Sequence, residues 1–240
     1  PEQQKIVKIL STWDNAIEKQ IQLIAQLENR KRGLMQQLLT GKKRLKGFEG
    51  AVTYTPLKPF LHELSERNRN NTATVLSVTN SKGFISQEEQ FDRIVASVDL
   101  SNYKVIRKGQ FAYNPSRVNV GSLDLLQTFR EGLLSPMYVV FKTNETKLLP
   151  IFLYYQLKSS WFIKHIPLFV QGSVRDSLSF DGLCAMKFFI PSIEEQTAIA
   201  EILSTADKEI DFAKKRRAGL KEQKKGLMQV LLTGEKRVRI

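Results

Sequence analysis

The chain contains one long segment twice. Residues 2–45 and residues 195–238 align at a constant offset without a gap, and about half of the paired positions are identical. Similarity over this length is far above chance for unrelated helices, so the repeat sets the organisation of the whole chain. The sequence therefore predicts two similar arms that bracket one long insert.

Both copies have the apolar spacing of a long amphipathic helix. Apolar residues recur every three or four positions, as in a heptad stripe interrupted by polar residues. One apolar stripe cannot stay in water, and the insert joins the end of one arm to the start of the other, so we expect the arms to pair as an antiparallel coiled coil. Two solitary helices that bind other proteins are the alternative. The residues predicted to make the pairing are Ile17, Leu27, Leu34 and Leu38 in the first arm and Ile210, Leu220, Leu227 and Leu231 in the second.

Local signals inside the arms predict where helices begin and end. Residues 11–14 and 204–207 match a capping box, which predicts either a new helix start or a kink at these places. Gly41 and Gly234 predict the ends of the helices. Some residues outside the stripe are identical in both arms, which we interpret as a shared exposed role; they include Gln3 with Gln196, Gln36 with Gln229, and Lys43 with Lys236.

The insert has a different pattern. Short β-rich runs between Gly, Asn-Pro and Ser-Pro turns predict strands, and apolar spacing over about 148–166 predicts a helix. The predicted strands cover 73–79, 103–107, 110–113 and 138–142. The expected fold class is α+β, with one mixed α/β domain flanked by two long helices that form an antiparallel coiled coil. The predicted boundaries are 1–45 for the first arm, 46–192 for the domain and 193–240 for the second arm.

Composition narrows the class of partner. The net charge of +13 favours a polyanion, of which nucleic acid is the commonest. The single cysteine excludes an intramolecular disulfide, and two histidines leave no Cys/His cluster with zinc spacing. Polar residues interrupt the most apolar run, so the sequence predicts a cytoplasmic protein without a membrane partner.

No local motif predicts catalysis, because phosphate-binding loops, nucleophile elbows and metal-ligand spacings are missing from the sequence. Residues 114–117 resemble only faintly the Asn-Pro-Pro-aromatic tetrapeptide of adenine methyltransferases, and we interpret them as a turn. We therefore expect no enzyme activity, no catalytic residue, no metal and no cofactor. An independent methyltransferase, which would have to bind S-adenosylmethionine, is the alternative.

Four turn-rich segments of the insert combine Arg or Lys with Asn, Gln or Ser: residues 67–71, 80–82, 114–119 and 171–177. Such side chains donate to phosphates and read base edges, although polar loops are also ordinary protein surface. Four of them in a basic chain favour double-stranded DNA as the partner. The candidate DNA-binding residues are Arg69, Asn80, Lys82, Arg117, Asn119, Ser173 and Arg175.

Several motifs in order resemble those of a known family. They are the K-x-G-L-M-Q-x-L-L-T-G motif of both arms and the segments 111–123, 133–141 and 172–196. Over nearly its whole length the chain resembles the specificity subunit of type I restriction-modification systems. The resemblance implies antiparallel conserved helices that separate two target-recognition domains and dock two methyltransferase (modification) subunits. A restriction (translocase-nuclease) subunit completes the endonuclease of that family.

The chain departs from this pattern in having one recognition domain. The strand-like lead-in at 186–190 has no counterpart before Pro1, so we expect a piece of a longer protein, or else a half-length subunit. The resemblance implies that the chain reads one half of a bipartite DNA site and scaffolds a modification subunit without catalysis of its own. Self-dimerisation is a further expectation. A coiled-coil assembly protein whose basic charge is incidental is the alternative.

Overall fold

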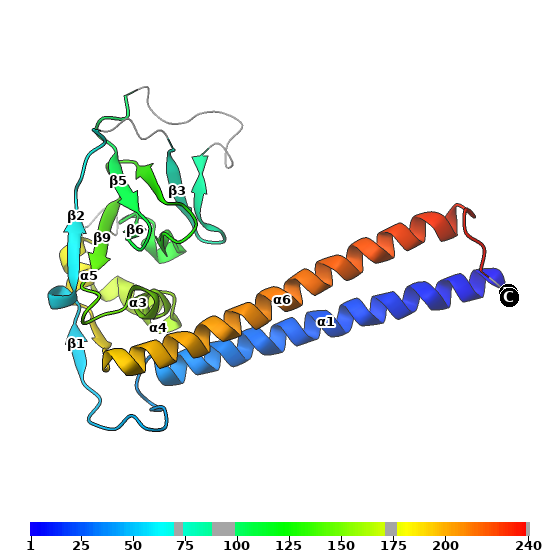
Figure 1. The fold of residues 1–240 in the computed structure, drawn as a ribbon, viewed down its shortest axis with the longest axis horizontal. Coiled ribbons are helices and arrows are strands. Elements are labelled where there is room, and N and C mark those ends of the chain that lie inside the picture. The colour runs from blue at the N-terminus through cyan, green and yellow to red at the C-terminus, as the bar shows by residue number, and fades with distance from the viewer. Residues whose placement is uncertain (70–73, 88–98, 171–176, 239–240) are drawn as a thin grey trace. The chain divides into compact units, whose positions relative to one another are not determined.

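The computed structural model describes residues 1–69, 74–87, 99–170 and 177–238 (Figure 1). The chain divides into two compact units, one made of residues 1–34 with 201–240 and the other of residues 35–200. The first contains most of two long helices, α1 (Glu2–Leu38) and α6 (Ile193–Leu232), and the second contains strands and short helices. This confirms the predicted α+β fold class with a long helix near each end of the sequence.

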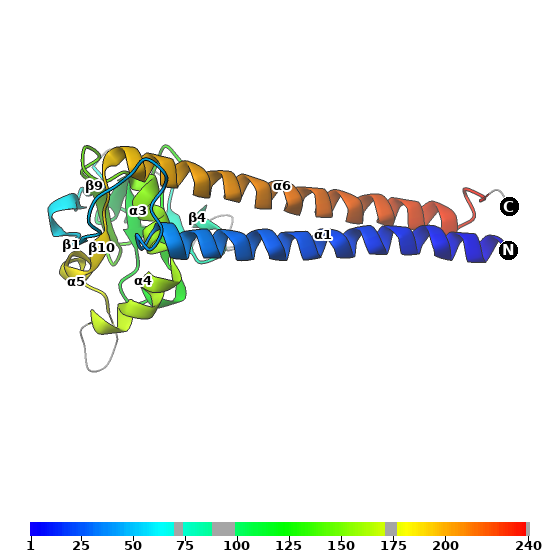
Figure 2. The same ribbon diagram turned by 90° about the horizontal axis from the view of Figure 1, so that it is seen from below.

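In the helical unit, α1 and α6 lie side by side in both ribbon views (Figures 1 and 2). Their ion pairs show the direction, because residues further along α1 contact residues earlier in α6. Lys224 lies 2.5 Å from Asp14, Lys214 lies 2.8 Å from Glu28, and Arg30 lies 3.0 Å from Glu209. The two helices are therefore antiparallel.

The apolar stripes provide the seam between these helices. Among the predicted pairing residues, Leu38, Ile210 and Leu231 are buried, whereas Ile17, Leu27, Leu34, Leu220 and Leu227 are partly buried. One polar side chain is also buried in the helix pair: Gln20 donates to the carbonyl of Ala213 at 3.1 Å. A polar group in an apolar seam favours the one register that satisfies it.

The predicted helix starts inside the arms are wrong, because α1 and α6 each run unbroken through the capping-box motifs. The Thr12 hydroxyl donates to the carbonyl of Lys8 at 2.9 Å, and Thr205 does the same to Glu201 at 2.8 Å. Hydroxyls that bond one turn back are compatible with a continuing helix. The Asp residue of the first motif, Asp14, pairs with the facing helix instead.

The second unit is built on short antiparallel strands. A four-stranded sheet has the order β2-β9-β6-β7, and two-stranded sheets join β1 to β10, β3 to β4 and β5 to β8. The strands are β1 (Tyr54–Pro56), β2 (Leu61–Leu64), β3 (Leu76–Thr79), β4 (Gly83–Ser86), β5 (Lys104–Arg107), β6 (Phe111–Tyr113), β7 (Leu123–Leu125), β8 (Glu131–Leu134), β9 (Val139–Thr143) and β10 (Lys187–Phe189). The four predicted strands correspond to β3, β5, β6 and β9, except that Ala73 lies outside the described residues.

Apolar side chains cover both faces of the central strand β6. Ala112 belongs to one buried cluster with Leu76, Val78 and Val140. Its neighbours on the strand point the other way, since successive side chains alternate, and Phe111 stacks on Phe141 at 4.9 Å between ring centroids. Burial on both faces explains why this segment reads as a continuous apolar run.

In the described part of the unit, the α-helices other than α1 and α6 are α3 (Pro150–Leu157), α4 (Ser160–His165) and α5 (Phe180–Ala185), and single 3-10 turns lie at η1 (Lys58–Phe60), η2 (Val118–Val120) and η3 (Ile166–Leu168). The single helix predicted over about 148–166 is therefore wrong. Ser159 has extended dihedrals, φ −74° and ψ 150°, and its hydroxyl accepts a hydrogen bond from the Phe162 amide at 3.2 Å. This cap begins a new helix and breaks the predicted one.

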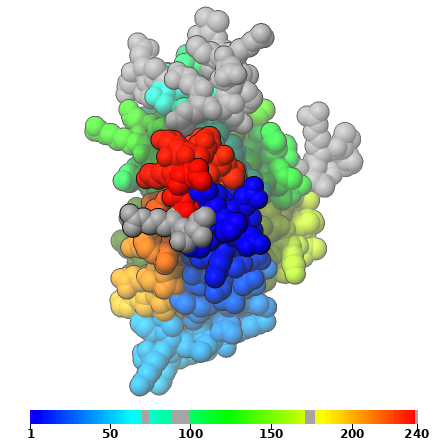
Figure 3. All heavy atoms as spheres, turned by 90° about the vertical axis from the view of Figure 1, so that its right-hand side faces the viewer, coloured from blue at the N-terminus to red at the C-terminus, as the bar shows by residue number. Residues whose placement is uncertain are grey.

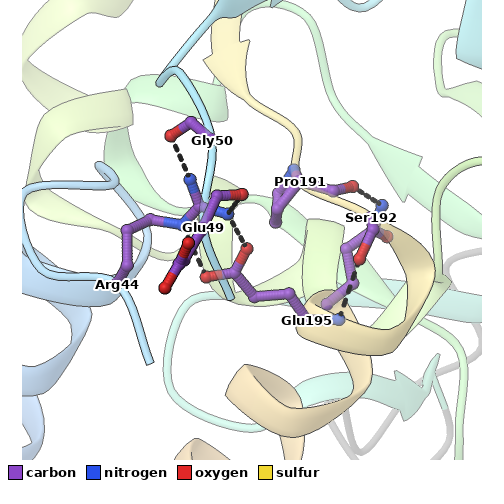
Figure 4. A network of polar contacts seen from close by, with 7 residues as sticks. Arg44, Glu49, Gly50, Pro191, Ser192 and Glu195 are labelled. Atoms are coloured by element: carbon purple, nitrogen blue, oxygen red, sulfur yellow. Dashed lines mark hydrogen bonds and ion pairs between the residues drawn. The ribbon is translucent and has the colours of Figure 1, made fainter. Parts of the chain in front are cut away.

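In the α+β unit, a buried ion pair joins the segment that follows α1 to the start of α6 (Figure 4). Two guanidinium nitrogens of Arg44 donate to the two carboxylate oxygens of Glu195 at 2.8 and 2.6 Å, and a third donates to the Gly50 carbonyl. The repeat-equivalent residues, Glu2 and Arg237, pair at 2.8 Å at the end of the helical unit, where the ends of α1 and α6 lie together (Figure 3). The repeat therefore encodes the same contact twice.

Gln196 contradicts the exposed role inferred from its identity with Gln3. Its side chain is completely buried, whereas Gln3 is exposed. The side-chain oxygen of Gln196 accepts a hydrogen bond from the backbone amide of Leu149 at 2.9 Å. Its side-chain nitrogen donates to the carbonyls of Lys147 and Pro191. The residue is therefore part of the interior of the α+β unit.

No helix in the described part of the chain is long and apolar enough to cross a membrane. The one cysteine, Cys184, is buried, and desolvation raises the pKa of its thiol to about 11. The thiol therefore stays protonated near neutral pH, which makes it a poor nucleophile.

Candidate nucleic-acid interface

The first polar segment, residues 80–82, is the turn between β3 and β4. The hydroxyl of Thr79 accepts from the Lys82 amide and donates to the Gly83 carbonyl, each at 3.2 Å. Gly83 adopts a φ of +65°, which glycine tolerates best. The turn is thus held by the Thr79 side chain, while Asn80 and Lys82 remain exposed.

The second segment, between β6 and β7, folds into a compact turn. The Asn114 amide donates to the Ser122 carbonyl at 3.0 Å, and the Ser122 amide donates to the Arg117 carbonyl at 3.1 Å. The Asn114 side-chain oxygen accepts from the Ser116 amide, which is the Asx-turn geometry that Asn-Pro sequences favour. Arg117 and Asn119 are exposed on this turn.

The fold brings these two segments together. The Ser122 hydroxyl donates to the Val78 carbonyl at 3.1 Å, which ties the second turn to β3. Asn80 packs so closely on Gly121 that a Cβ at position 121 would collide with the Asn80 side chain. Two turns separated by more than thirty residues in sequence therefore form one surface, which we call the 80/117 surface and define by Asn80, Lys82, Arg117 and Asn119.

This close packing gives a prediction. Gly121→Ala should lower the free energy of unfolding by about 3 kcal/mol, because it adds a clash with Asn80 to the strain of a residue at φ +91°. Gly47→Ala is the matched control: Gly47 has the same φ of +91° but open space around it, so only about 1 kcal/mol is expected. Urea unfolding measures both variants, and equal losses would contradict the packing.

The third polar segment is described only at its end. Arg175 and Ser173, two of the candidate DNA-binding residues, lie outside the described residues. The amide of Leu178 donates to the Pro115 carbonyl at 3.1 Å, so the chain that follows the segment reaches the second turn. The chain that precedes it also lies there, because Val170 shares a small crevice of about 30 Å³ with Pro115 and Asn119.

The fourth segment is placed elsewhere. The Arg67 guanidinium donates to the Asn102 carbonyl, and the Asn68 amide donates to the Tyr103 carbonyl at 3.0 Å. Arg69 is exposed, but none of the contacts in the described ranges joins it to the 80/117 surface. The structure thus places two of the four segments, 80–82 and 114–119, side by side. The residues described on either side of a third segment, 171–177, also lie next to the second turn.

In the described part of the chain, several charged side chains elsewhere in the α+β unit form ion pairs, unlike those of the 80/117 surface. Arg107 is engaged by Glu66 at 2.6 Å, and this contact lowers the pKa of the Glu66 carboxyl. Asp124, the carboxylate next to Gly83, pairs with Lys158 at 3.1 Å. Within the described ranges, the side chains of Lys82 and Arg117 form no ion pair.

Two exposed apolar residues beside this surface were missed by the sequence reasoning. Val120 and Met137 are 54% and 63% exposed, and the Asn114 side-chain amide lies 3.6 Å from the Met137 sulfur. The sequence signal for Met137 is the Ser-Pro pair directly before it, which marks a turn. The strand had been expected to begin at the residue after Met137.

The arrangement is suited to binding more than to bond-breaking chemistry. In the part of the chain that the structure describes, no three His, Cys, Asp or Glu residues are grouped to hold a metal ion. The 80/117 surface combines two cations with two amide side chains, which are the groups that contact phosphates and base edges. The 80/117 surface is therefore a candidate nucleic-acid interface on the α+β unit.

Comparisons with known proteins agree with this class. Residues 133–222 match the family model described as type I restriction modification DNA specificity domain. The chain is 28% identical to the type I restriction enzyme MjaVIII specificity subunit of Methanocaldococcus jannaschii, with 99% of this chain and 61% of that protein covered. The putative MjaX specificity subunit of the same organism is 27% identical over 99% of this chain and 58% of that protein.

Solved structures have the same fold. The HsdS subunit from Thermoanaerobacter tengcongensis aligns with a TM-score of 0.58 at 14% identity, covering 95% of this chain and 56% of that one. The type I restriction-modification S subunit from M. genitalium aligns with a TM-score of 0.60 at 16% identity, covering 96% and 60%. These likenesses support the fold alone.

The chain is similar in sequence to specificity subunits of type I restriction-modification systems and shares their fold, with one α+β unit and a pair of long helices. It spans about three-fifths of the length of the curated relatives that it matches.

Proposed function

We propose that the chain recognises a specific sequence in double-stranded DNA through the 80/117 surface, as one half of a bipartite site, and has no catalytic activity of its own. The observation that carries the proposal is the convergence of Lys82 and Arg117, two cations without ion-pair partners in the described ranges, from separate turns onto one surface. The net charge of +13 supports it, since basic proteins attract the phosphate backbone over a distance. A function on DNA would place the protein in the cytoplasm.

DNA binding should be strongly salt-dependent, because each phosphate contact releases counterions. Lys82→Gln and Arg117→Gln should each weaken binding to duplex DNA several-fold and reduce the salt slope by about one. Lys215→Gln is the matched control, since it removes the same charge from an exposed site on α6 and should change neither quantity. Fluorescence anisotropy over a salt series measures both. Affinity that stays flat with salt, or equal losses in all three variants, would refute the interface.

We also propose that the helix pair is a platform for a methyltransferase (modification) subunit, to which a restriction (translocase-nuclease) subunit is added in the full complex. The supporting observation is an approximate twofold arrangement of equivalent residues. Lys31 pairs with Asp207, and the repeat-equivalent Lys224 pairs with Asp14. A helix pair with this symmetry offers similar surfaces to two copies of one partner, and because this chain has one recognition domain we expect only one of the two docking surfaces to be complete.

The stoichiometry tests the platform. Light scattering on the chain mixed with a modification subunit should give a one-to-one complex, or a two-to-two complex if the chain also dimerises. Apolar side chains such as Phe212 and Leu23, 69% and 42% exposed on the helix pair, are where dimerisation or partner binding would bury surface. Absence of any complex at micromolar concentration would contradict the platform and favour the alternative, in which the chain is a coiled-coil assembly protein.

A further inference from the structure

Two connections meet at one end of the central strands. Tyr113 of β6 pairs with Leu123 on one side and with Val139 on the other. The turn after Tyr113 and the turn before Val139 therefore lie at the same end of these strands. The second of these is the turn at 135–138, which carries Met137 next to Asn114. Met137 thus lies beside the 80/117 surface.

The turn that carries Met137 is held firmly. Within it, the Tyr138 amide donates to the Ser135 carbonyl at 3.0 Å. The Tyr138 carbonyl accepts from Lys104 at 2.6 Å, and the Tyr138 hydroxyl accepts from the Val78 amide at 3.4 Å. Burial lowers the pKa of the Lys104 amine, and its hydrogen bond to the Tyr138 carbonyl supports the turn. The exposed thioether is therefore presented by a fixed backbone.

A single exposed apolar side chain needs no explanation by itself. Met137 differs because of its surroundings: it contacts Asn114, which begins the turn that carries Arg117 and Asn119, donors suited to phosphates and base edges, and Val120 adds a second exposed apolar group on that turn. In the major groove, the 5-methyl group of thymine is the one apolar feature among the base edges. A thioether is polarisable and adaptable, which suits contact with such a group.

We infer that Met137 is a specificity-determining residue that contacts the 5-methyl group of a thymine in the recognised half-site. The inference rests on the proposed DNA-recognition function and deepens it. Lys82 and Arg117 position the duplex through phosphates, which carry no sequence information, and Met137 adds discrimination for thymine at one position. The contact is apolar, so it contributes to sequence preference without contributing to the salt slope.

The test needs the preferred sequence first. The full chain selects its preferred duplex from a random pool, and each thymine of that duplex is then replaced in turn by deoxyuridine, which lacks only the methyl group. One replacement should weaken binding about fourfold, as expected for burial of one methyl group. Met137→Ala should weaken binding to the thymine duplex by a similar factor and should bind the two duplexes equally, which is the signature of a direct coupling.

The controls separate this inference from the function on which it rests. Leu232→Ala removes an apolar side chain of similar exposure, 64%, from the end of α6 and should keep the thymine preference. If Met137→Ala retains the full preference, or if no thymine is sensitive to loss of its methyl group, the inference is overturned while DNA recognition stands. If the chain enriches no sequence from the pool, both fail. Melting temperatures should be the same for all three proteins, since neither side chain is buried.

Discussion

Replacing Gln196 with alanine should lower the free energy of unfolding by about 3 kcal/mol, whereas Gln3→Ala should change it by less than about 0.5 kcal/mol. The two residues are repeat-equivalent, so the chain supplies its own matched control. The Gln196 side chain satisfies the Leu149 amide and the carbonyls of Lys147 and Pro191 in an environment with no access to water. Its loss leaves three buried backbone groups unpaired.

Urea unfolding of the two variants measures this difference. Because the affected groups belong to the α+β unit, near-UV circular dichroism should show the loss, as it reports the packing of the aromatic side chains there. Similar losses in both variants would mean that the buried hydrogen bonds of Gln196 contribute little, and its role would then have to be sought elsewhere.

The second large effect is expected in the helix pair. Ile210→Asp should destabilise it by about 4 kcal/mol, because an aspartate buried in an apolar seam has no partner for its charge. Phe212→Asp, two residues further along α6, is the control: Phe212 is 69% exposed, so the change should cost less than about 0.5 kcal/mol. Far-UV circular dichroism during thermal melting measures both.

The two variants also test the sidedness of α6. A helix that packs by its apolar stripe should tolerate the loss of a large aromatic residue outside the stripe better than the loss of a smaller residue within it. If Phe212→Asp is the more damaging change, the seam lies on another face of α6 and the antiparallel pairing must be revised.

The arms were the easiest part to predict, because their pattern is local and occurs twice. Heptad spacing predicts the helices, and the insert, which joins the end of one arm to the start of the other, predicts the antiparallel direction that the Asp14–Lys224 contact shows. The capping-box motifs did not begin new helices, because a Ser-x-x-Asp sequence has two uses. Its carboxylate can cap a helix, or it can face a partner helix, and only the partner decides which.

The α+β unit was harder because its contacts are long-range. Strands rich in β-branched residues were found, but β2 (LHEL) and β8 (EGLL) carry no such signal and are set by pairing with β9 and β5. Spacing alone also could not reveal the break at Ser159, which depends on a single cap. In the interface, composition found Lys82 and Arg117, whereas their proximity depends on the fit of Asn80 against Gly121.

That fit has a consequence for retargeting the protein. Because Asn80 rests on Gly121, the turn at 80–82 and the turn at 114–122 cannot be mutagenised independently: a bulkier residue in one displaces the other. Libraries that randomise one turn at a time will be dominated by misplaced loops. Variants with a new preference should emerge when both turns are diversified together, with position 121 kept as glycine.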